Sequence, residues 1–165
     1  MNTVGYKASI IAAMGAGVLI TSAPAYAASA AGQFNVNMTL TPKCEIFNGS
    51  GATGTIGNLG LSYTSFQTSA STASTNFAVR CTNTHGYGLA LDNASITDGS
   101  TGLAYTLNLS SSSTHSSSTN ASLTGLSGNG NTGQTYYVHG TIAAGQDGTV
   151  TSGTANNQRT LTITY

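Results

Sequence analysis

Two segments near the two ends of the chain alternate strictly between apolar and polar residues. Residues 33–40 read QFNVNMTL and residues 159–165 read RTLTITY. Strict alternation of this length predicts β-strands that bury one face. The apolar positions are Phe34, Val36, Met38 and Leu40 in the first segment, and Leu161, Ile163 and Tyr165 in the second. Terminal strands of this kind either pair within their own domain or are offered to a neighbouring chain.

Residues 1–27 have the features of a secretion signal. Lys7 supplies a weakly positive start, residues 8–20 form an apolar run, and residues 24–27 end in a small-x-small pattern that a signal peptidase could cut before Ala28. The apolar run is too short to span a bilayer, and no later segment could do so. A retained N-terminal anchor is the alternative. We therefore expect a single secreted domain, residues 28–165, with no transmembrane segment and room for one hydrophobic core.

Charge is sparse in the expected mature chain. It has three basic side chains, Lys43, Arg80 and Arg159, and four acidic ones, Glu45, Asp92, Asp98 and Asp147. Binding to nucleic acid or to an anionic membrane requires a cluster of basic residues. The sequence has no such cluster, so we expect neither partner.

Cys44 and Cys81 both follow the expected signal and lie in strand-like contexts. In an oxidising compartment an even number of cysteines predicts a disulfide, here Cys44–Cys81. The alternative is a zinc site, but His85, His115 and His139 have no ligand-like spacing to the cysteines. The sequence therefore favours the disulfide and predicts no metal or cofactor.

Further strand candidates recur between turn-rich spacers. They are residues 44–47, 76–81, 86–91, 103–109 and 136–142, the last with a bend at Gly140, and a weaker element holds Leu123 and Leu126. Ile56, Leu59 and Leu61 lie in a Gly-rich stretch, and the Ser-rich residues 110–120 are expected to form a solvated loop. Short strands with frequent turn signals predict an all-β sandwich.

The residue types that carry catalysis are scattered. The four carboxylates have no pairwise spacing suited to acid–base work, and no Gly-x-Ser-x-Gly elbow is present. Each histidine is better explained as a surface or hydrogen-bonded residue, with His139 pointing outward or between the sheets. Tyr136 and Tyr137 alternate to opposite faces and form no aromatic platform for a sugar. We expect no enzyme.

Four segments, taken in order, resemble the spore coat protein U domain family, which includes the major subunits of archaic chaperone–usher pili. They are residues 34–44, residues 77–92 with the pattern FAVRCT followed by YGLALD, residues 103–107, and residues 138–146 leading to 161–165. The chain departs from the family at His139 and Thr141, where tyrosine and arginine are usual. It also has Gly-Thr-Ala at residues 153–155, where the family usually has Gly-x-Tyr.

This resemblance implies an immunoglobulin-like sandwich, residues 41–165, that lacks its last strand. A periplasmic chaperone, and then the N-terminal segment of another subunit at an outer-membrane usher, would complete it by strand addition. The donor would be residues 28–40, with Phe34, Val36, Met38 and Leu40 as its buried side chains. The acceptor groove would be flanked by Leu161, Ile163 and Tyr165, with their side chains facing the core. The family thus implies a surface pilus that serves adhesion or biofilm formation.

Three alternatives stay open at this stage. Residues 34–40 could be the first internal strand of a complete monomeric sandwich, leaving only residues 28–33 as a donor. The chain could form a non-fibrous spore coat or extracellular matrix. A carbohydrate-binding or enzymatic module would need clustered aromatic or acidic side chains.

Overall fold

The computed structural model describes residues 29–47, 54, 56–149 and 156–165. The expected signal, residues 1–27, lies outside these ranges. The chain divides into two units, Met1–Met38 and Thr39–Tyr165. In the first unit, residues 29–38 form neither helix nor strand and are exposed. Among the described residues, no helix is long and apolar enough to cross a membrane.

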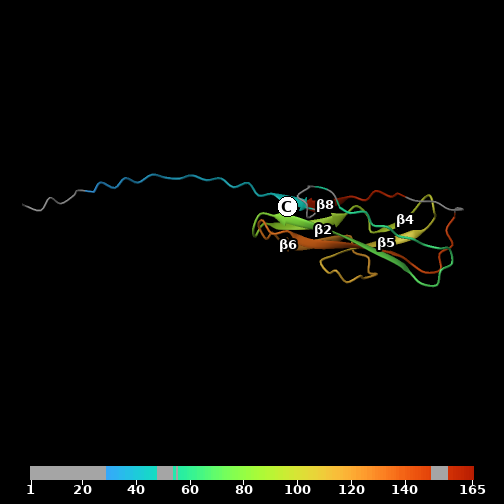
Figure 1. Cartoon of the computed structure of the whole chain (residues 1–165). Helices are drawn as coiled ribbons and strands as arrows, with labels where there is room; N and C mark the ends of the chain where they lie inside the picture. The colour runs from blue at the N-terminus through green and yellow to red at the C-terminus, as the bar shows by residue number, and fades with distance from the viewer. Residues whose placement is uncertain (1–28, 48–53, 55, 150–155) are drawn as a thin grey trace, which may run out of the picture. The chain divides into compact units, whose positions relative to one another are not determined.

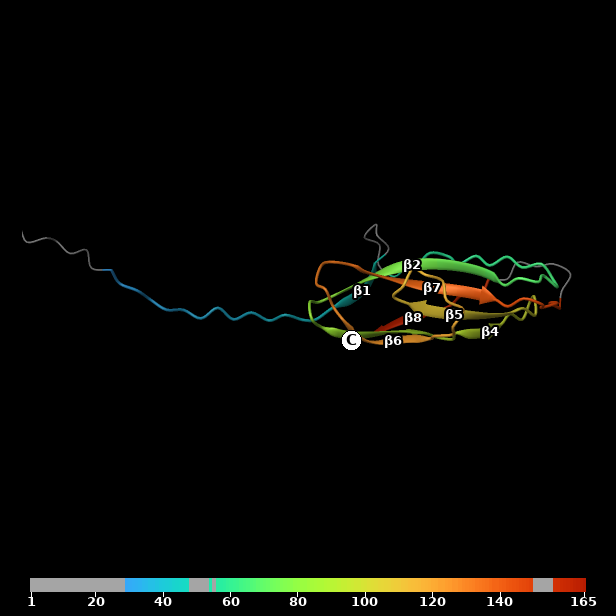
Figure 2. The ribbon, with the colours of Figure 1, turned by 90° about the horizontal axis from the view of Figure 1, so that it is seen from below.

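The second unit is all-β, as the sequence predicts. Its strands are β1 (Cys44–Phe47), β2 (Ser71–Cys81), β3 (Gly86–Leu91), β4 (Ser95–Thr97), β5 (Ala104–Ser110), β6 (Ser122–Ser127), β7 (Gln134–Ile142) and β8 (Leu161–Thr164). One sheet has the order β1-β2-β7-β5-β4 and the other the order β6-β3-β8, with every named pair antiparallel. The two sheets form a β-sandwich (Figures 1 and 2).

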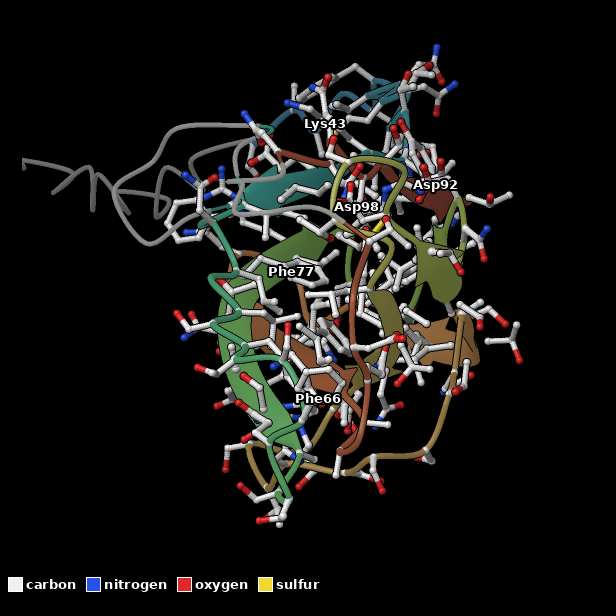
Figure 3. All side chains as sticks on the ribbon, turned by 90° about the vertical axis from the view of Figure 1, so that its right-hand side faces the viewer. Lys43, Phe66, Phe77, Asp92 and Asp98 are labelled. Atoms are coloured by element: carbon white, nitrogen blue, oxygen red, sulfur yellow. A yellow bond between two sulfur atoms is a disulfide. The ribbon has the colours of Figure 1, made fainter. Side chains whose placement is uncertain are left out.

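The two ends of the sandwich are called proximal, where Cys44 pairs with Cys81, and distal, where Ser71 pairs with Ile142. The proximal end carries the turn of residues 82–85 and the start of β1. The distal end carries residues 62–70, 98–103 and 143–149. Figure 3 views the molecule from the distal end, along the strands.

The core lies between the sheets and follows the period-2 alternation. Its buried side chains include Phe77 and Val79 of β2, Tyr87 and Leu89 of β3, Leu107 and Leu109 of β5, and Tyr136, Val138 and Ile142 of β7. The ring of Phe77 packs on that of Tyr136, with centroids 5.9 Å apart. The hydroxyls of Tyr87 and Tyr136 are 2.6 Å apart, and burial raises the pKa of Tyr87 far above its ordinary value. Buried hydroxyls of this kind need such partners.

Strand β7 runs unbroken from Gln134 to Ile142, so Gly140, where a bend was predicted, does not interrupt it. Gly140 instead makes room for a neighbour. A β-carbon placed on it would lie 2.7 Å from Cδ2 of Leu59 and 3.2 Å from Cδ1 of Leu61. Leu59 belongs to the Gly-rich connection between β1 and β2, which forms no strand in its described residues yet packs on the core.

Two regions of strand were missed by the sequence pattern. β4 is only three residues long, and the first half of β2 reads STAST, where small polar residues hide the alternation. Conversely, residues 33–40 alternate strictly but form no strand. An alternating pattern indicates that a segment could lie in a sheet, whereas forming a strand also requires a neighbouring strand to pair with.

Candidate functional site: two strand edges and an exposed segment

The N-terminal alternating segment exposes all four of its large apolar side chains. Phe34 is 86%, Val36 68%, Met38 90% and Leu40 77% exposed. Residues 34–40 are not assigned to a strand. Single exposed apolar residues are common in proteins, but a row of four at alternate positions is typical of an interaction segment.

Strand β8 pairs with β3 on one side only. Thr160 O accepts a hydrogen bond from Asp92 N at 3.0 Å. This bond shows which residues of β8 direct their backbone groups toward β3. In an antiparallel pair, alternate residues direct both backbone groups to the partner. The backbone groups of Leu161 and Ile163 therefore point away from β3, and the described residues place no strand on that side.

Strand β1 ends the other sheet and lies on the same side of the sandwich as β8 (Figures 1 and 2). Thr82 N donates to Lys43 O at 2.9 Å, so the backbone groups of Cys44 and Ile46 face away from β2. Gly54 N donates to Ile46 O at 3.1 Å and satisfies part of this edge. Of the two edges, β8 thus offers the less occupied row of hydrogen-bonding groups.

The side chains of β8 agree only in part with the sequence. Leu161 and Ile163 are half-buried and pack on the core, as expected for residues that flank a groove. The expectation that Tyr165 faces the core is wrong. It lies beyond the end of β8, is 58% exposed and meets His85 edge-on, with ring centroids 6.0 Å apart.

The disulfide Cys44–Cys81 is present and ties β1 to β2 at the proximal end. Its two residues are direct partners across the ladder, so the bond fastens the edge strand whose other side is only partly paired. Of the bonds that the sequence predicts, the structure shows the disulfide. Pairing between the candidate donor and acceptor residues stays a prediction.

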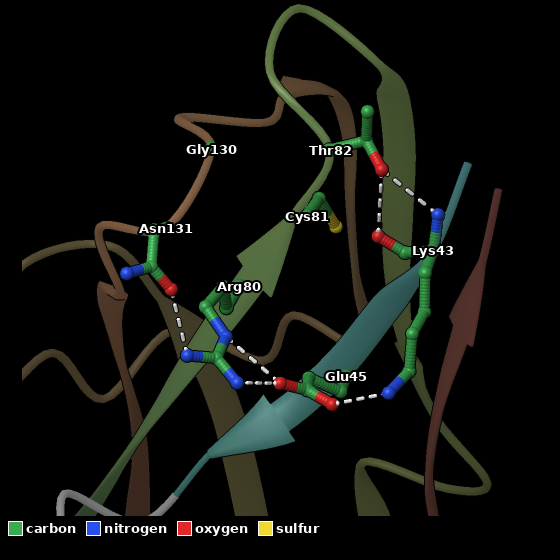
Figure 4. Close-up of a pocket in the computed structure, with 7 residues that line it drawn as sticks. All are labelled: Lys43, Glu45, Arg80, Cys81, Thr82, Gly130 and Asn131. Atoms are coloured by element: carbon green, nitrogen blue, oxygen red, sulfur yellow. Dashed lines mark hydrogen bonds and ion pairs between the residues drawn. The ribbon is translucent and has the colours of Figure 1, made fainter. Parts of the chain in front are cut away.

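A charged cluster lies beside the disulfide on the outer face of β1 and β2 (Figure 4). Glu45 accepts from both Nε and Nη2 of Arg80, and Lys43 Nζ lies 2.8 Å from Glu45 Oε2. Arg80 also stacks on Phe47, with Cζ 5.3 Å from the ring centroid, and donates to Asn131. Hydrogen bonds from Lys43 and Arg80 lower the pKa of Glu45. The cluster keeps one net positive charge, and the Lys43 side chain is 72% exposed.

The Ser-rich loop of residues 110–120 is mostly exposed, but it also covers part of the outer face of the larger sheet. His139 is 1% exposed beneath it. Ser112 O lies 3.0 Å from Nε2 of His139, and Ser74 Oγ lies 2.7 Å from Nδ1. Because a carbonyl only accepts, Nε2 donates to Ser112 O, while the Ser74 hydroxyl hydrogen-bonds to the other ring nitrogen, Nδ1. His139 is thus a hydrogen-bonded residue of the outer face.

His115 comes from the loop itself. Its ring lies edge-on to that of His139, with centroids 5.3 Å apart, and its Nε2 is 3.3 Å from Gly140 O. Neither the spacing of the histidines nor the loop composition signals this arrangement. The described residues contain no group of three or more metal-ligating side chains.

No family model matches the chain, and no curated protein matches it.

Proposed function

We propose that the chain is a structural subunit of a surface pilus, assembled by strand complementation between copies. The observation that carries this proposal is the coexistence, in one chain, of an exposed alternating apolar segment and a strand edge that the described residues leave unpaired. Strand addition gives affinity through backbone hydrogen bonds and specificity through alternate side chains. The edge of β8, with Leu161 and Ile163 beside it, can accept such a strand, and residues 34–40 have the pattern of one.

In the proposed complex, burial of the donor side chains offsets the cost of ordering the donor, and backbone hydrogen bonds to the edge of β8 supply the affinity. Burying four side chains of this size stabilises a complex by roughly 6–12 kcal/mol before ordering costs. Fixing the backbone of the donor takes back about 1–2 kcal/mol for each residue. The disulfide holds β1 in place before the donor arrives, which limits what must be ordered on binding.

The proposal includes two partner proteins that accompany the chain from the periplasm to the cell surface. An unpaired edge beside exposed apolar residues invites aggregation, so a periplasmic chaperone that lends a strand and an outer-membrane usher that releases it are expected. The proposed route runs through the periplasm to the cell surface, where the polymer would serve adhesion or biofilm formation. Sparse charge suits adhesion through apolar and hydrogen-bonding contacts, with little dependence on salt.

The test uses oxidised protein that begins at residue 41. Its thermal unfolding is measured alone, with a peptide of residues 28–40, and with the same peptide carrying Val36→Asp and Met38→Asp. We expect the native peptide to raise the midpoint and the altered peptide to leave it unchanged, because charged residues cannot enter an apolar groove. The size of the chain that begins at residue 28 is then measured: ladders of polymer support a pilin.

A midpoint that no peptide changes would refute strand complementation. A chain from residue 28 that stays monomeric, despite binding of the peptide to the truncated domain, would instead favour an ordinary sandwich. Surface association without filaments would favour the coat or matrix function.

A further inference from the structure

In a polymer of this kind, the linker between the donor segment and the sandwich limits where the next copy can lie. Only residues 41–43 separate Leu40 from Cys44, the first residue of β1. Four fully extended steps span at most about 14 Å. Pro42 also fixes one backbone dihedral in this linker. If residues 34–40 occupy the groove of a neighbour, the sandwich that follows must contact that neighbour at the end where Leu40 emerges.

The direction of the donor decides which end that is. Strand β8 runs from the distal end to the proximal end, because Thr164 pairs with Gly88 after the proximal turn and Leu161 with Leu91. A donor antiparallel to β8 continues the pattern of its sheet, and antiparallel pairs are slightly more stable per residue. Such a donor places Phe34 at the proximal end of the acceptor and Leu40 at its distal end. The proximal end of one copy then meets the distal end of the next.

The distal end presents an exposed aromatic ring on a rigid loop. Phe66 is 74% exposed and has a φ of 64°, in the left-handed region that residues with bulky side chains rarely adopt. Its N–H donates to Gln146 O at 2.8 Å, and Ser65 Oγ donates to Asp147 O at 2.7 Å. Two connections far apart in the sequence thus hold Phe66 in a costly backbone conformation that directs its ring to solvent. Strain that is held in this way is typical of functional contacts.

The distal end also carries charge that matches the proximal end. Asp147 is exposed, and the described residues give its carboxylate no ion pair. The proximal end carries the Lys43–Glu45–Arg80 cluster, with one net positive charge and an exposed Lys43. The opposite direction of the donor would instead bring the exposed Lys43 side chains of two copies together. Charge therefore favours the head-to-tail contact.

We propose that Phe66 and Asp147 form a docking surface for the proximal end of a second copy of this chain. In this contact Asp147 pairs with Lys43 of that copy, and Phe66 packs on its linker, residues 41–43. This inference rests on the proposed function, because the linker limits the position of the next copy only when the donor occupies the groove. It adds a second contact between successive copies that sets their relative orientation.

Charge reversal tests the pairing in the polymer of the chain from residue 28. We expect Asp147→Lys and Lys43→Asp each to speed dissociation of the polymer about two- to fivefold, the range for an exposed ion pair. The two changes together should slow dissociation relative to Lys43→Asp alone, which keeps the same loss of the ion pair with Glu45. Ser117→Lys, in the exposed loop of residues 110–120, is the control for added charge and should leave the rate unchanged. Rates that are the same in all variants would overturn the contact.

Phe66→Asn tests the ring, because asparagine tolerates a positive φ and the loop can keep its conformation. We expect faster dissociation of the polymer, with unchanged thermal unfolding of the truncated domain and unchanged binding of the peptide of residues 28–40. Zero-length cross-linking gives a direct check, since Lys43 is the only lysine after residue 28. A Lys43–Asp147 bond between copies is expected, whereas bonds between copies that join Lys43 only to Glu45 would show that two proximal ends meet.

The two proposals fail in different ways. If the native peptide does not bind the truncated domain, both are overturned. If the peptide binds but the Asp147, Lys43 and Phe66 variants behave as the original chain, only the contact between the ends is overturned.

Discussion

Cδ2 of Leu59 lies 2.7 Å from the position that a β-carbon on Gly140 would take. The side chain of an unpaired connection therefore sits directly over the backbone of a central strand. Only glycine at this position leaves enough room for the contact.

Gly140→Ala should lower the free energy of unfolding by about 1–3 kcal/mol, the usual cost of overpacking a core. Denaturant unfolding of the oxidised domain measures this. Gly60→Ala is the matched control, because a β-carbon there meets nothing within 4 Å. Trimming the opposing side chain with Leu59→Ala should make the Gly140→Ala change less costly. Equal effects of Gly140→Ala and Gly60→Ala would contradict the contact.

Removing the disulfide should destabilise the domain. Cys44 and Cys81 are separated by 37 residues, and the chain-entropy account gives a loop of this size about 4 kcal/mol of stabilisation. The double change Cys44→Ala and Cys81→Ala should therefore lower the unfolding midpoint strongly. A reductant should do the same to the original chain and have no effect on the variant. A midpoint that is insensitive to both would show that β1 needs no covalent fastening.

Asp98 should make stability depend on acidity. Hydrogen bonds from Thr101 and Asn157 lower the pKa of this carboxyl below its ordinary value of 3.8. A depressed folded pKa means that the stabilisation is fully present above the unfolded pKa. It is lost as the pH falls from about 3.8 through the lower folded value. Unfolding free energies measured from neutral pH to pH 2 should show this loss.

The loss of stability at low pH, called the acid limb here, can be assigned to Asp98 with two variants. Asp98→Asn should reduce stability at neutral pH and flatten the limb. Thr101→Val removes the hydroxyl that donates to Asp98 Oδ2 at 2.6 Å, so the limb should move toward higher pH. An unchanged limb in both variants would assign it to another carboxyl such as Glu45, whose pKa is also lowered.

His139→Ala should release the loop of residues 110–120 from the sheet. The imidazole joins Ser74 of β2 to the Ser112 carbonyl of the loop, and its loss leaves both groups without that partner. A buried polar group left unsatisfied costs about 1–3 kcal/mol. Hydrogen exchange in the loop should speed up, and Ser74→Ala should give a smaller change in the same direction. Ser117→Ala, in the exposed part of the loop, is the control that should leave exchange unchanged.

Much of the fold could be predicted from local pattern. The bounds of β1 and β3, and the buried faces of β2, β3, β5 and β7, follow from alternation, because each side chain's face depends only on its position along its own strand. The disulfide was predictable from the number of cysteines and the expected compartment. The candidate donor residues were also visible in the sequence, and their role stays a prediction.

Other features could not be read from the sequence. Tyr165 continues the alternation of β8 but lies beyond its last paired residue. The loop of residues 110–120 has the composition of a solvated loop, yet His115 and Ser112 contact the sheet. Phe66 shows no pattern at all, since its exposure and positive φ depend on hydrogen bonds with the connection near Gln146.

The sequence by itself therefore determined where strands could form, which of their faces are apolar and which cysteines could bond. Those properties depend on neighbours along the chain. Only the three-dimensional structure shows which strands pair and which edges the described residues leave unpaired. It also shows that Leu59 packs on Gly140 and that His139 hydrogen-bonds to the loop of residues 110–120. Ser74 and His139 are 65 residues apart in the sequence, and contacts over such separations depend on the packing of whole sheets, which no local pattern records.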